Sequence, residues 1–170
     1  MKKKMVFALA AIVTCLGLGT LSSCQDDTAA FQKEEIAYFE EQRDFIRKKK
    51  TEKDKEGQLL YKEIVYMNDT VLYRVLEKPT STGVEVNENT PITMLLKGAN
   101  TNGVLFQNEA EMTFMPKQLI FGLRPVLVAS QPGGKYEALI PASLGYGYYS
   151  QSGIRGGSTL IFTFTVKEIH

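Results

Sequence analysis

Histidine is almost absent from this sequence, and its scarcity removes several classes of catalysis. The one histidine among 170 residues is His170, the last residue. A Ser-His-Asp or Cys-His catalytic group therefore has no base available, and neither a zinc nor a haem site is expected. We predict a protein that works without a metal or any other cofactor. Any reaction that it catalyses should need no nucleophile and no strong base.

The chain also lacks a marked excess of charge of either sign. Its formal net charge is +1, with 44% hydrophobic and 23% charged residues, which is ordinary for a globular domain. Without residues 1–23, which contain three lysines and no acidic residue, the chain has 17 basic and 19 acidic residues. A weakly acidic protein lacks the basic surface that nucleic acids require, so no nucleic-acid partner is expected.

Residues 1–23 have the pattern of an export signal. Lys2–Lys4 are followed by the apolar run Val6–Leu18, which is too short for an ordinary membrane span. The next segment, Leu21-Ser22-Ser23-Cys24, resembles a bacterial lipobox, in which the chain is cut before the cysteine and the thiol is acylated. The alternative is an ordinary signal peptide with a chance cysteine. We predict a lipoprotein signal peptide over residues 1–23 and a lipid anchor at Cys24, which would place the protein on the outer membrane of a bacterial cell envelope, facing the periplasm or the surface.

The two cysteines agree with this prediction. Cys15 lies in the segment that would be removed and Cys24 would be lipidated, so neither a free thiol nor a disulfide is expected in the mature chain. Gln25-Asp26-Asp27 follows directly. This acidic stretch is similar to the surface-export signal of some Gram-negative lipoproteins, or it is an unremarkable polar linker.

Residues 24–57 are predicted to form a lipidated tether and a charged helix. Aromatic residues recur every seven positions at Phe31, Tyr38 and Phe45, which gives a helix over residues 28–50 one apolar stripe. Three roles for this stripe remain open at this stage: it docks on the following domain, pairs with another copy of the chain, or lies on lipid.

Residues 58–170 have the pattern of an α+β domain with several antiparallel strands. The last strand shows it best, because Leu160, Phe162, Phe164 and Val166 alternate with polar residues and so give the strand one apolar face. A tight turn is predicted at Asn68-Asp69. One short helix is predicted over residues 123–129, and strands over the following ranges: 64–67, 71–76, 92–97, 104–106, 136–140 and 159–167.

Roughly residues 70–170 resemble the FKBP family of peptidyl-prolyl cis-trans isomerases through five motifs in the right order. These motifs are Lys97-Gly98 with Asn102 to Phe106, Phe114 with Leu119 to Leu123, Pro132 to Lys135 with Leu139 to Pro141, Leu144 to Gly147, and Ser158 to Phe162. The resemblance implies a bent antiparallel half-barrel wrapped around a short helix, with a substrate pocket between them. It also implies that proline-containing peptides or proteins are the substrates.

The resemblance assigns site residues by position. It implies that Phe106, Ile120, Tyr146 and Phe162 are the catalytic residues, with the Ile120 backbone N–H and the Tyr146 hydroxyl as donors to the substrate. Five further positions would contact the substrate: Leu96, Gln107, Leu119, Leu123 and Ile154. The plainer interpretation of the apolar members is the ordinary core that any half-barrel needs.

Several positions depart from the family pattern. The chain has no tryptophan, so Leu123 stands where members usually place one; Gln107 replaces an aspartate and Leu96 a tyrosine. Arg155-Gly156-Gly157 replaces a Pro-Pro pair and should be more mobile. Two hypotheses follow: a lipid-anchored isomerase that assists the folding of envelope proteins, and a non-catalytic FKBP-like module that binds protein.

Overall fold

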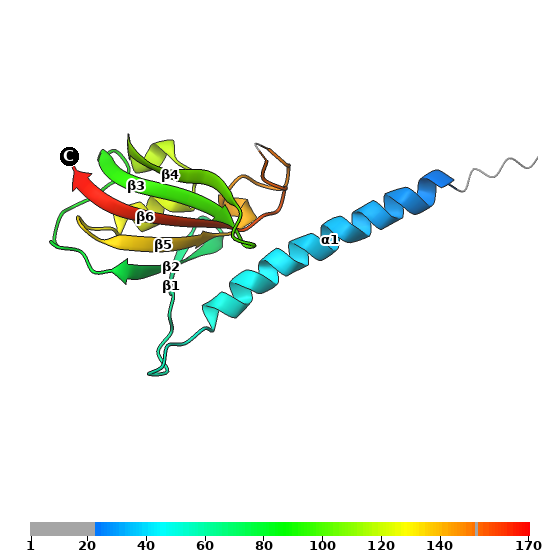
Figure 1. The fold of residues 1–170 in the computed structure, drawn as a ribbon, viewed down its shortest axis with the longest axis horizontal. Coiled ribbons are helices and arrows are strands. Elements are labelled where there is room, and N and C mark those ends of the chain that lie inside the picture. The colour runs from blue at the N-terminus through cyan, green and yellow to red at the C-terminus, as the bar shows by residue number, and fades with distance from the viewer. Residues whose placement is uncertain (1–22, 152) are drawn as a thin grey trace, which may run out of the picture.

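A computed structural model describes residues 23–151 and 153–170 as one long helix followed by a six-stranded sheet (Figure 1). The predicted signal peptide lies almost wholly outside the described residues. The helices are α1 (Ser23–Lys50) and α2 (Leu123–Val128), with short 3₁₀ turns η1 (Pro116–Gln118) and η2 (Ala142–Leu144). The strands are β1 (Lys62–Tyr66), β2 (Asp69–Glu77), β3 (Ile92–Asn100), β4 (Leu105–Phe114), β5 (Lys135–Ile140) and β6 (Leu160–Ile169).

All neighbouring strands are antiparallel, in the order β1-β2-β5-β6-β3-β4. The predicted α+β class and bent antiparallel sheet, preceded by a helix, are therefore confirmed. The boundary predicted at residue 58 stays a prediction.

Strand β6 shows how the sequence pattern builds the core. It lies between β5 and β3, and Leu160, Phe162, Phe164 and Val166 are all buried. The buried side chains of α2 pack against the same face, as part of one apolar core. The pleat explains the alternation, because successive side chains of a strand point to opposite faces.

The turn between β1 and β2 and the register of β3 are two local features that shape the sheet. The tight turn between β1 and β2 occurs at Met67-Asn68, one residue before the predicted position. Asp69 instead pairs with Tyr66 and accepts a hydrogen bond from the Thr70 N–H at 2.7 Å. In β3 the register with β4 shifts on both sides of Gly98, and such irregularities bend a strand.

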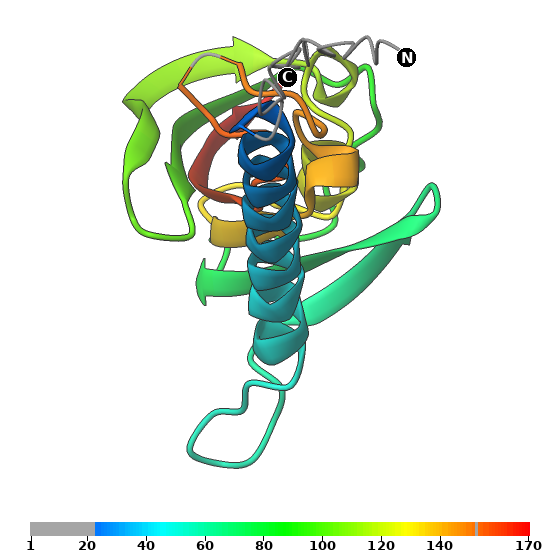
Figure 2. The same ribbon diagram turned by 90° about the vertical axis from the view of Figure 1, so that its right-hand side faces the viewer.

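The C-terminal half of α1 docks on the sheet domain, which is one of the three roles left open by the sequence. Phe45 and Ile46 pack against a small buried cluster of Tyr61, Leu72 and Leu139. The helix lies in front of the domain in Figure 2, and its N-terminal part projects beyond the domain in Figure 1. The apolar stripe is accordingly divided, since Phe31 is 64% exposed.

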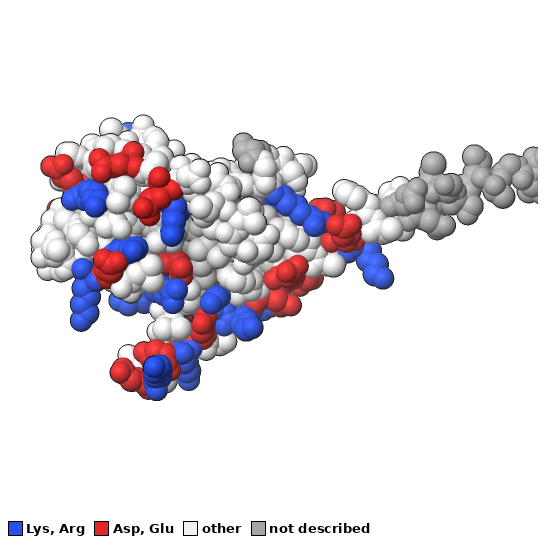
Figure 3. All heavy atoms as spheres, in the orientation of Figure 1, with Lys and Arg blue, Asp and Glu red and all other residues white. Residues whose placement is uncertain are grey.

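The charged residues of α1 are of both signs. Lys and Arg alternate with Asp and Glu along the part of the helix seen in Figure 3, and the last turn is basic. None of the helices in the described ranges is both long and apolar enough to cross a membrane.

Candidate functional site

An apolar cavity of about 340 Å³ opens between the sheet, α2 and the segments that precede β6. All nine residues that the sequence suggested as a site line this one cavity. They are Leu96, Phe106, Gln107, Leu119, Ile120, Leu123, Tyr146, Ile154 and Phe162. They come from β3, β4, the segment before α2, α2 itself, the loop after η2, and β6.

Three aromatic rings form one wall of the cavity. The ring of Phe106 meets that of Phe162 edge to face, with centroids 5.4 Å apart and planes at 76°. It meets Tyr146 in the same way at 6.5 Å and 81°. This tilted arrangement is favoured by the ring quadrupoles. Gly98 makes it possible, because a methyl group at that position would overlap the Phe106 ring.

The floor of the cavity is buried and apolar. Leu123 is 2% exposed, and Leu96, Ile154 and Phe162 are also buried. None of the residues lining the cavity is acidic or basic. Gln107 is a polar but uncharged residue of the lining. Its Nε2 donates a hydrogen bond to the Asn108 carbonyl of the same strand at 3.0 Å. The cavity can therefore enclose an apolar group and exclude water from it.

Two features of the cavity lining can donate to a ligand: the Ile120 backbone N–H and the Tyr146 hydroxyl have no partner elsewhere in the described part of the chain. The backbone around Ile120 is held in place, because Arg124 Nε donates to the Leu119 carbonyl at 3.0 Å and Leu123 N–H donates to the Ile120 carbonyl at 3.1 Å. The Arg124 guanidinium also lies 4.3 Å from the Phe121 ring centroid. Hydrogen-bond donors beside an apolar cavity are suited to an amide carbonyl.

A comparison with protein families shows to which family the chain belongs. The model of the FKBP-type peptidyl-prolyl cis-trans isomerases matches residues 83–167, half of the chain. The chain belongs to this family. The matched residues contain all nine of the suggested site positions and exclude α1.

Individual members of the family share about a third of their residues with this chain over the matched segment. The FKBP-type isomerases FkpA of two Buchnera aphidicola subspecies, Acyrthosiphon pisum and Schizaphis graminum, are 32% and 34% identical over 91 and 86 residues. These matches cover 51% and 48% of this chain but only 38% and 34% of the relatives' own length. The chain thus matches little more than a third of each of these curated relatives.

Solved structures agree on the fold. FkpA from Escherichia coli superposes with a TM-score of 0.58 at 23% identity, covering 85% of this chain and 62% of that one. A peptidyl-prolyl cis-trans isomerase from Pseudomonas syringae pv. tomato DC3000 gives 0.60 at 20% identity, covering 84% and 95%. At such identities the likeness establishes the fold alone.

Three further residues line the cavity of this FKBP-type domain. Met112 and Phe114 come from β4 and Gln151 from the loop after η2. The period-two pattern could have found Met112, which shares its strand parity with Phe114. No pattern indicates Gln151, because its loop has no periodicity; its amide donates to the Tyr146 carbonyl at 3.3 Å.

The predicted absence of a metal concerns the whole chain. Among the described residues no group of His, Cys, Asp and Glu side chains is arranged to hold a metal ion. The apolar lining of the FKBP-type cavity offers no ligand set either.

Proposed function

We propose that this protein is a peptidyl-prolyl cis-trans isomerase, anchored by lipid in the cell envelope, that assists the folding of envelope proteins. The observation that supports the activity best is the pair of free donors, the Ile120 N–H and the Tyr146 hydroxyl, beside a charge-free cavity with three aromatic rings. Membership in the isomerase family agrees with this proposal.

The arrangement suits rotation about a prolyl bond. The barrier of about 18–20 kcal/mol arises from the partial double-bond character of the C–N bond. Twisting removes that character and makes the amide less polar, so an apolar cavity stabilises the twisted state relative to the planar one. The Ile120 N–H would hold the peptide carbonyl, and the ring wall would hold the proline. No covalent intermediate is needed.

The activity is tested with Xaa-Pro peptides in a protease-coupled or NMR exchange assay of the purified protein. We expect acceleration by the wild type and a reduced rate for Tyr146→Phe, which loses one donor but keeps the ring. A folded wild-type protein that accelerates no Xaa-Pro peptide and no proline-limited refolding reaction would contradict the proposal.

A second candidate function is a non-catalytic protein-binding module. Leu123 at the cavity floor, where the family usually has a larger ring, and the uncharged Gln107 favour it, because both reduce the contacts available to a bound proline. Tight binding to a proline-free envelope protein, unaffected by Tyr146→Phe, would favour this module over the isomerase.

The sequence pattern before Cys24 supports the lipid anchor. Cys24 is the second residue of α1. We expect Cys24→Ser to leave the protein unlipidated and to release it from the membrane fraction. Immunoblots of fractionated cells and mass spectrometry of the N-terminus measure this. Membrane association that is unchanged in Cys24→Ser would disprove the anchor.

A further inference from the structure

The loop between η2 and β6 supplies three residues to the cavity and contains an isolated antiparallel bridge but no helix or strand. We call residues 145–151 and 153–158 the pocket loop. Tyr146, Gln151 and Ile154 from this loop line the cavity. Inside the loop, Gln151 and Ile154 exchange backbone hydrogen bonds at 3.0 and 2.8 Å, and the Gly157 N–H donates to the Gly147 carbonyl at 2.9 Å. These few internal bonds leave the loop with a lower local stability than the sheet, so contacts from outside affect how firmly it is held. The source of that restraint therefore bears on the shape of the site.

The second arm of the pocket loop is attached to α1 by an ion pair. The Arg155 guanidinium lies 2.6 Å from a carboxylate oxygen of Glu35 and 3.3 Å from one of Glu34. It also lies 4.1 Å from the ring centroid of Tyr38. The hydrogen bond with Glu35 raises the pKa of Arg155 above its ordinary value. Three side chains of α1 thus meet one side chain of the loop.

A chain of hydroxyl groups fixes the backbone of the same arm. Ser158 Oγ donates to the Arg155 carbonyl at 2.7 Å. The Tyr38 hydroxyl lies 2.6 Å from Ser158 Oγ and can donate to it. Just beyond the loop, the Gln42 carbonyl and side chain of α1 bind Thr159 at 3.2 and 2.9 Å. Arg155-Gly156-Gly157 replaces the usual Pro-Pro pair, and we expected this segment to be mobile. In the structure α1 makes direct contacts with it, which should restrain its motion.

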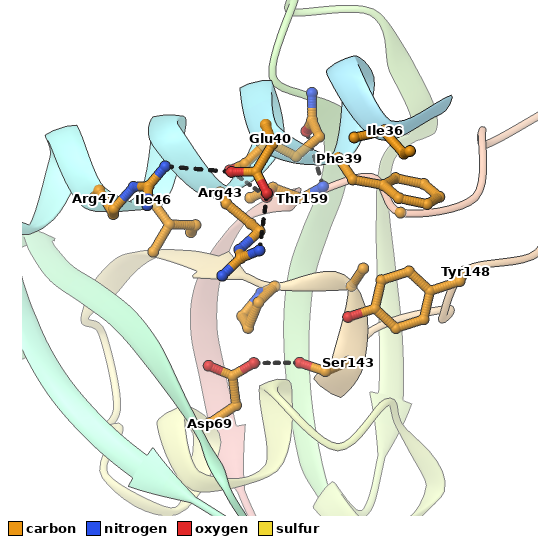
Figure 4. Close-up of a pocket in the computed structure, with 14 residues that line it drawn as sticks. Ile36, Phe39, Glu40, Arg43, Ile46, Arg47, Asp69, Ser143, Tyr148 and Thr159 are labelled. Carbon is orange, nitrogen blue, oxygen red and sulfur yellow. Dashed lines mark hydrogen bonds and ion pairs between the residues drawn. The ribbon is translucent and has the colours of Figure 1, made fainter. Parts of the chain in front are cut away.

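Aromatic packing attaches the first arm. The ring of Phe39 meets Tyr148 edge to face at 5.6 Å and 72°, and Figure 4 shows the two rings approaching each other from α1 and the loop. A methyl group at Gly157 would overlap the Phe39 ring, so this close approach requires glycine there. Both arms of the pocket loop are consequently held by one stretch of α1, residues 34–42.

We propose that Arg155, Glu35 and Tyr38 are positioning residues, through which α1 holds Tyr146 and Ile154 of the pocket loop in their places in the cavity. Because Ile154 directly precedes Arg155, a displacement of the guanidinium moves a residue of the cavity wall. The helix lies outside residues 83–167, the segment that matches the isomerase family model. The inference rests on the proposed isomerase activity.

Loss of the ion pair should act on substrate affinity more than on turnover. A looser loop lowers the fraction of molecules with a complete cavity, and the apparent dissociation constant rises by the inverse of that fraction. Substrate binds the conformation in which the cavity is complete and so shifts the population towards it. Once substrate is bound, kcat should therefore change little. Since exposed ion pairs contribute modestly, we expect KM to rise roughly three-fold in Arg155→Ala.

The experiment compares variants of the purified full chain that differ in this contact alone. They are Arg155→Ala, Arg155→Glu, and the charge reversal Arg155→Glu with Glu35→Arg. The matched control is Arg47→Ala, because Arg47 also pairs with carboxylates of α1 but does not touch the loop. The first readout is KM and kcat for an Xaa-Pro peptide. The second is the NMR signals of the Ile154 and Ile120 methyl groups, with Ile92 in the buried core as reference.

We expect Arg155→Ala to shift the Ile154 methyl signal and to raise KM, while the control leaves both unchanged and the charge reversal restores both. Raising NaCl from about 0.05 M to about 0.5 M should raise KM in the wild type more than in Arg155→Ala, because salt screens the ion pair. If the single variants Arg155→Ala and Arg155→Glu both keep the wild-type KM and the wild-type methyl signals, the proposal is overturned.

The methyl readout separates this inference from the isomerase proposal. If the wild type accelerates no substrate, the isomerase proposal fails, and the Ile154 signal still reports whether α1 positions the loop. If the wild type is active but Arg155→Ala matches it in KM and in the Ile154 signal, only the positioning role is disproved.

Discussion

The cavity and the contact with α1 are built from different interactions. The cavity wall consists of buried apolar side chains such as Leu96, Leu123 and Phe162. The contact with α1 combines half-buried rings with individual polar contacts, among them the Arg155–Glu35 pair and the buried Gln42. Burial of a whole apolar side chain stabilises a fold by about 1.5–3 kcal/mol, whereas a partly exposed ion pair contributes about 0–1 kcal/mol. The cavity should therefore be robust, and the contact with α1 adjustable.

The largest effect is expected from Phe162→Ala, which removes a ring from the cavity wall. Its cost to the free energy of unfolding should be about 3–5 kcal/mol, and isomerase activity should be lost. Phe164→Ala is the matched control, because Phe164 lies two residues further along β6 in the same core, is buried, and does not line the cavity. Urea unfolding and the isomerase assay measure the two properties.

The pair of phenylalanine variants tests whether the cavity has a function beyond stability. Phe164→Ala should destabilise the protein to a similar extent and keep its activity per folded molecule. Equal activity per folded molecule in both variants would mean that the ring wall is ordinary core.

A smaller effect is expected from Gln42→Ala in the contact with α1. Gln42 is 4% exposed, and its Oε1 accepts the Thr159 N–H at 2.9 Å. An unsatisfied buried N–H should lower the free energy of unfolding by about 1–3 kcal/mol. The neighbouring exposed Glu41→Ala is the control, with an expected change within about 0.5 kcal/mol. If both variants unfold at the same urea concentration, α1 contributes no stability through this residue.

The smallest effect is expected from Tyr61→Phe, beneath the C-terminal half of α1. The Tyr61 hydroxyl donates to Glu137 Oε1 at 2.7 Å, and its loss should cost about 1 kcal/mol near neutral pH. Burial, and then the hydrogen bond to the Glu137 carboxylate, raise the pKa of Tyr61 well above its ordinary value.

This raised pKa predicts a pH dependence with a definite sign. The folded state favours the neutral hydroxyl of Tyr61. The contribution of this hydroxyl to the free energy of unfolding is therefore complete below about pH 10, the ordinary pKa of tyrosine, and is lost as the pH rises towards the pKa of the folded state. The wild type should therefore lose more stability than Tyr61→Phe between about pH 8 and about pH 10.5. Urea midpoints at the two pH values test this, and an equal loss in both proteins would contradict it.

The cavity lining was largely predictable because its residues belong to motifs with local signatures. Phe162 and its alternating neighbours reveal a strand with one buried face, and the nine suggested positions all line one cavity. Which of them act on a substrate stays a prediction. Gln151 was not predictable, since its place depends on how an irregular loop folds back over the cavity.

The helix shows the opposite case. Its apolar stripe predicted an amphipathic helix but left its partner undecided, and the stripe divides between the buried half around Phe45 and the exposed Phe31. The most buried side chain described in α1 is polar, Gln42, which a hydrophobicity pattern assigns to solvent.

The sequence alone determined the strand alternation, the helix and nine of the residues that line the cavity, because each depends on a period of two or 3.6 residues or on a short motif. Only the tertiary structure decided where α1 docks and that Tyr38 and Gln42 contact the segment around Arg155, beside the cavity. The partners Gln42 and Thr159 are 117 residues apart. Hydrogen bonds over such a separation leave no periodic trace in the chain, because their geometry exists only after both elements have packed on the same core.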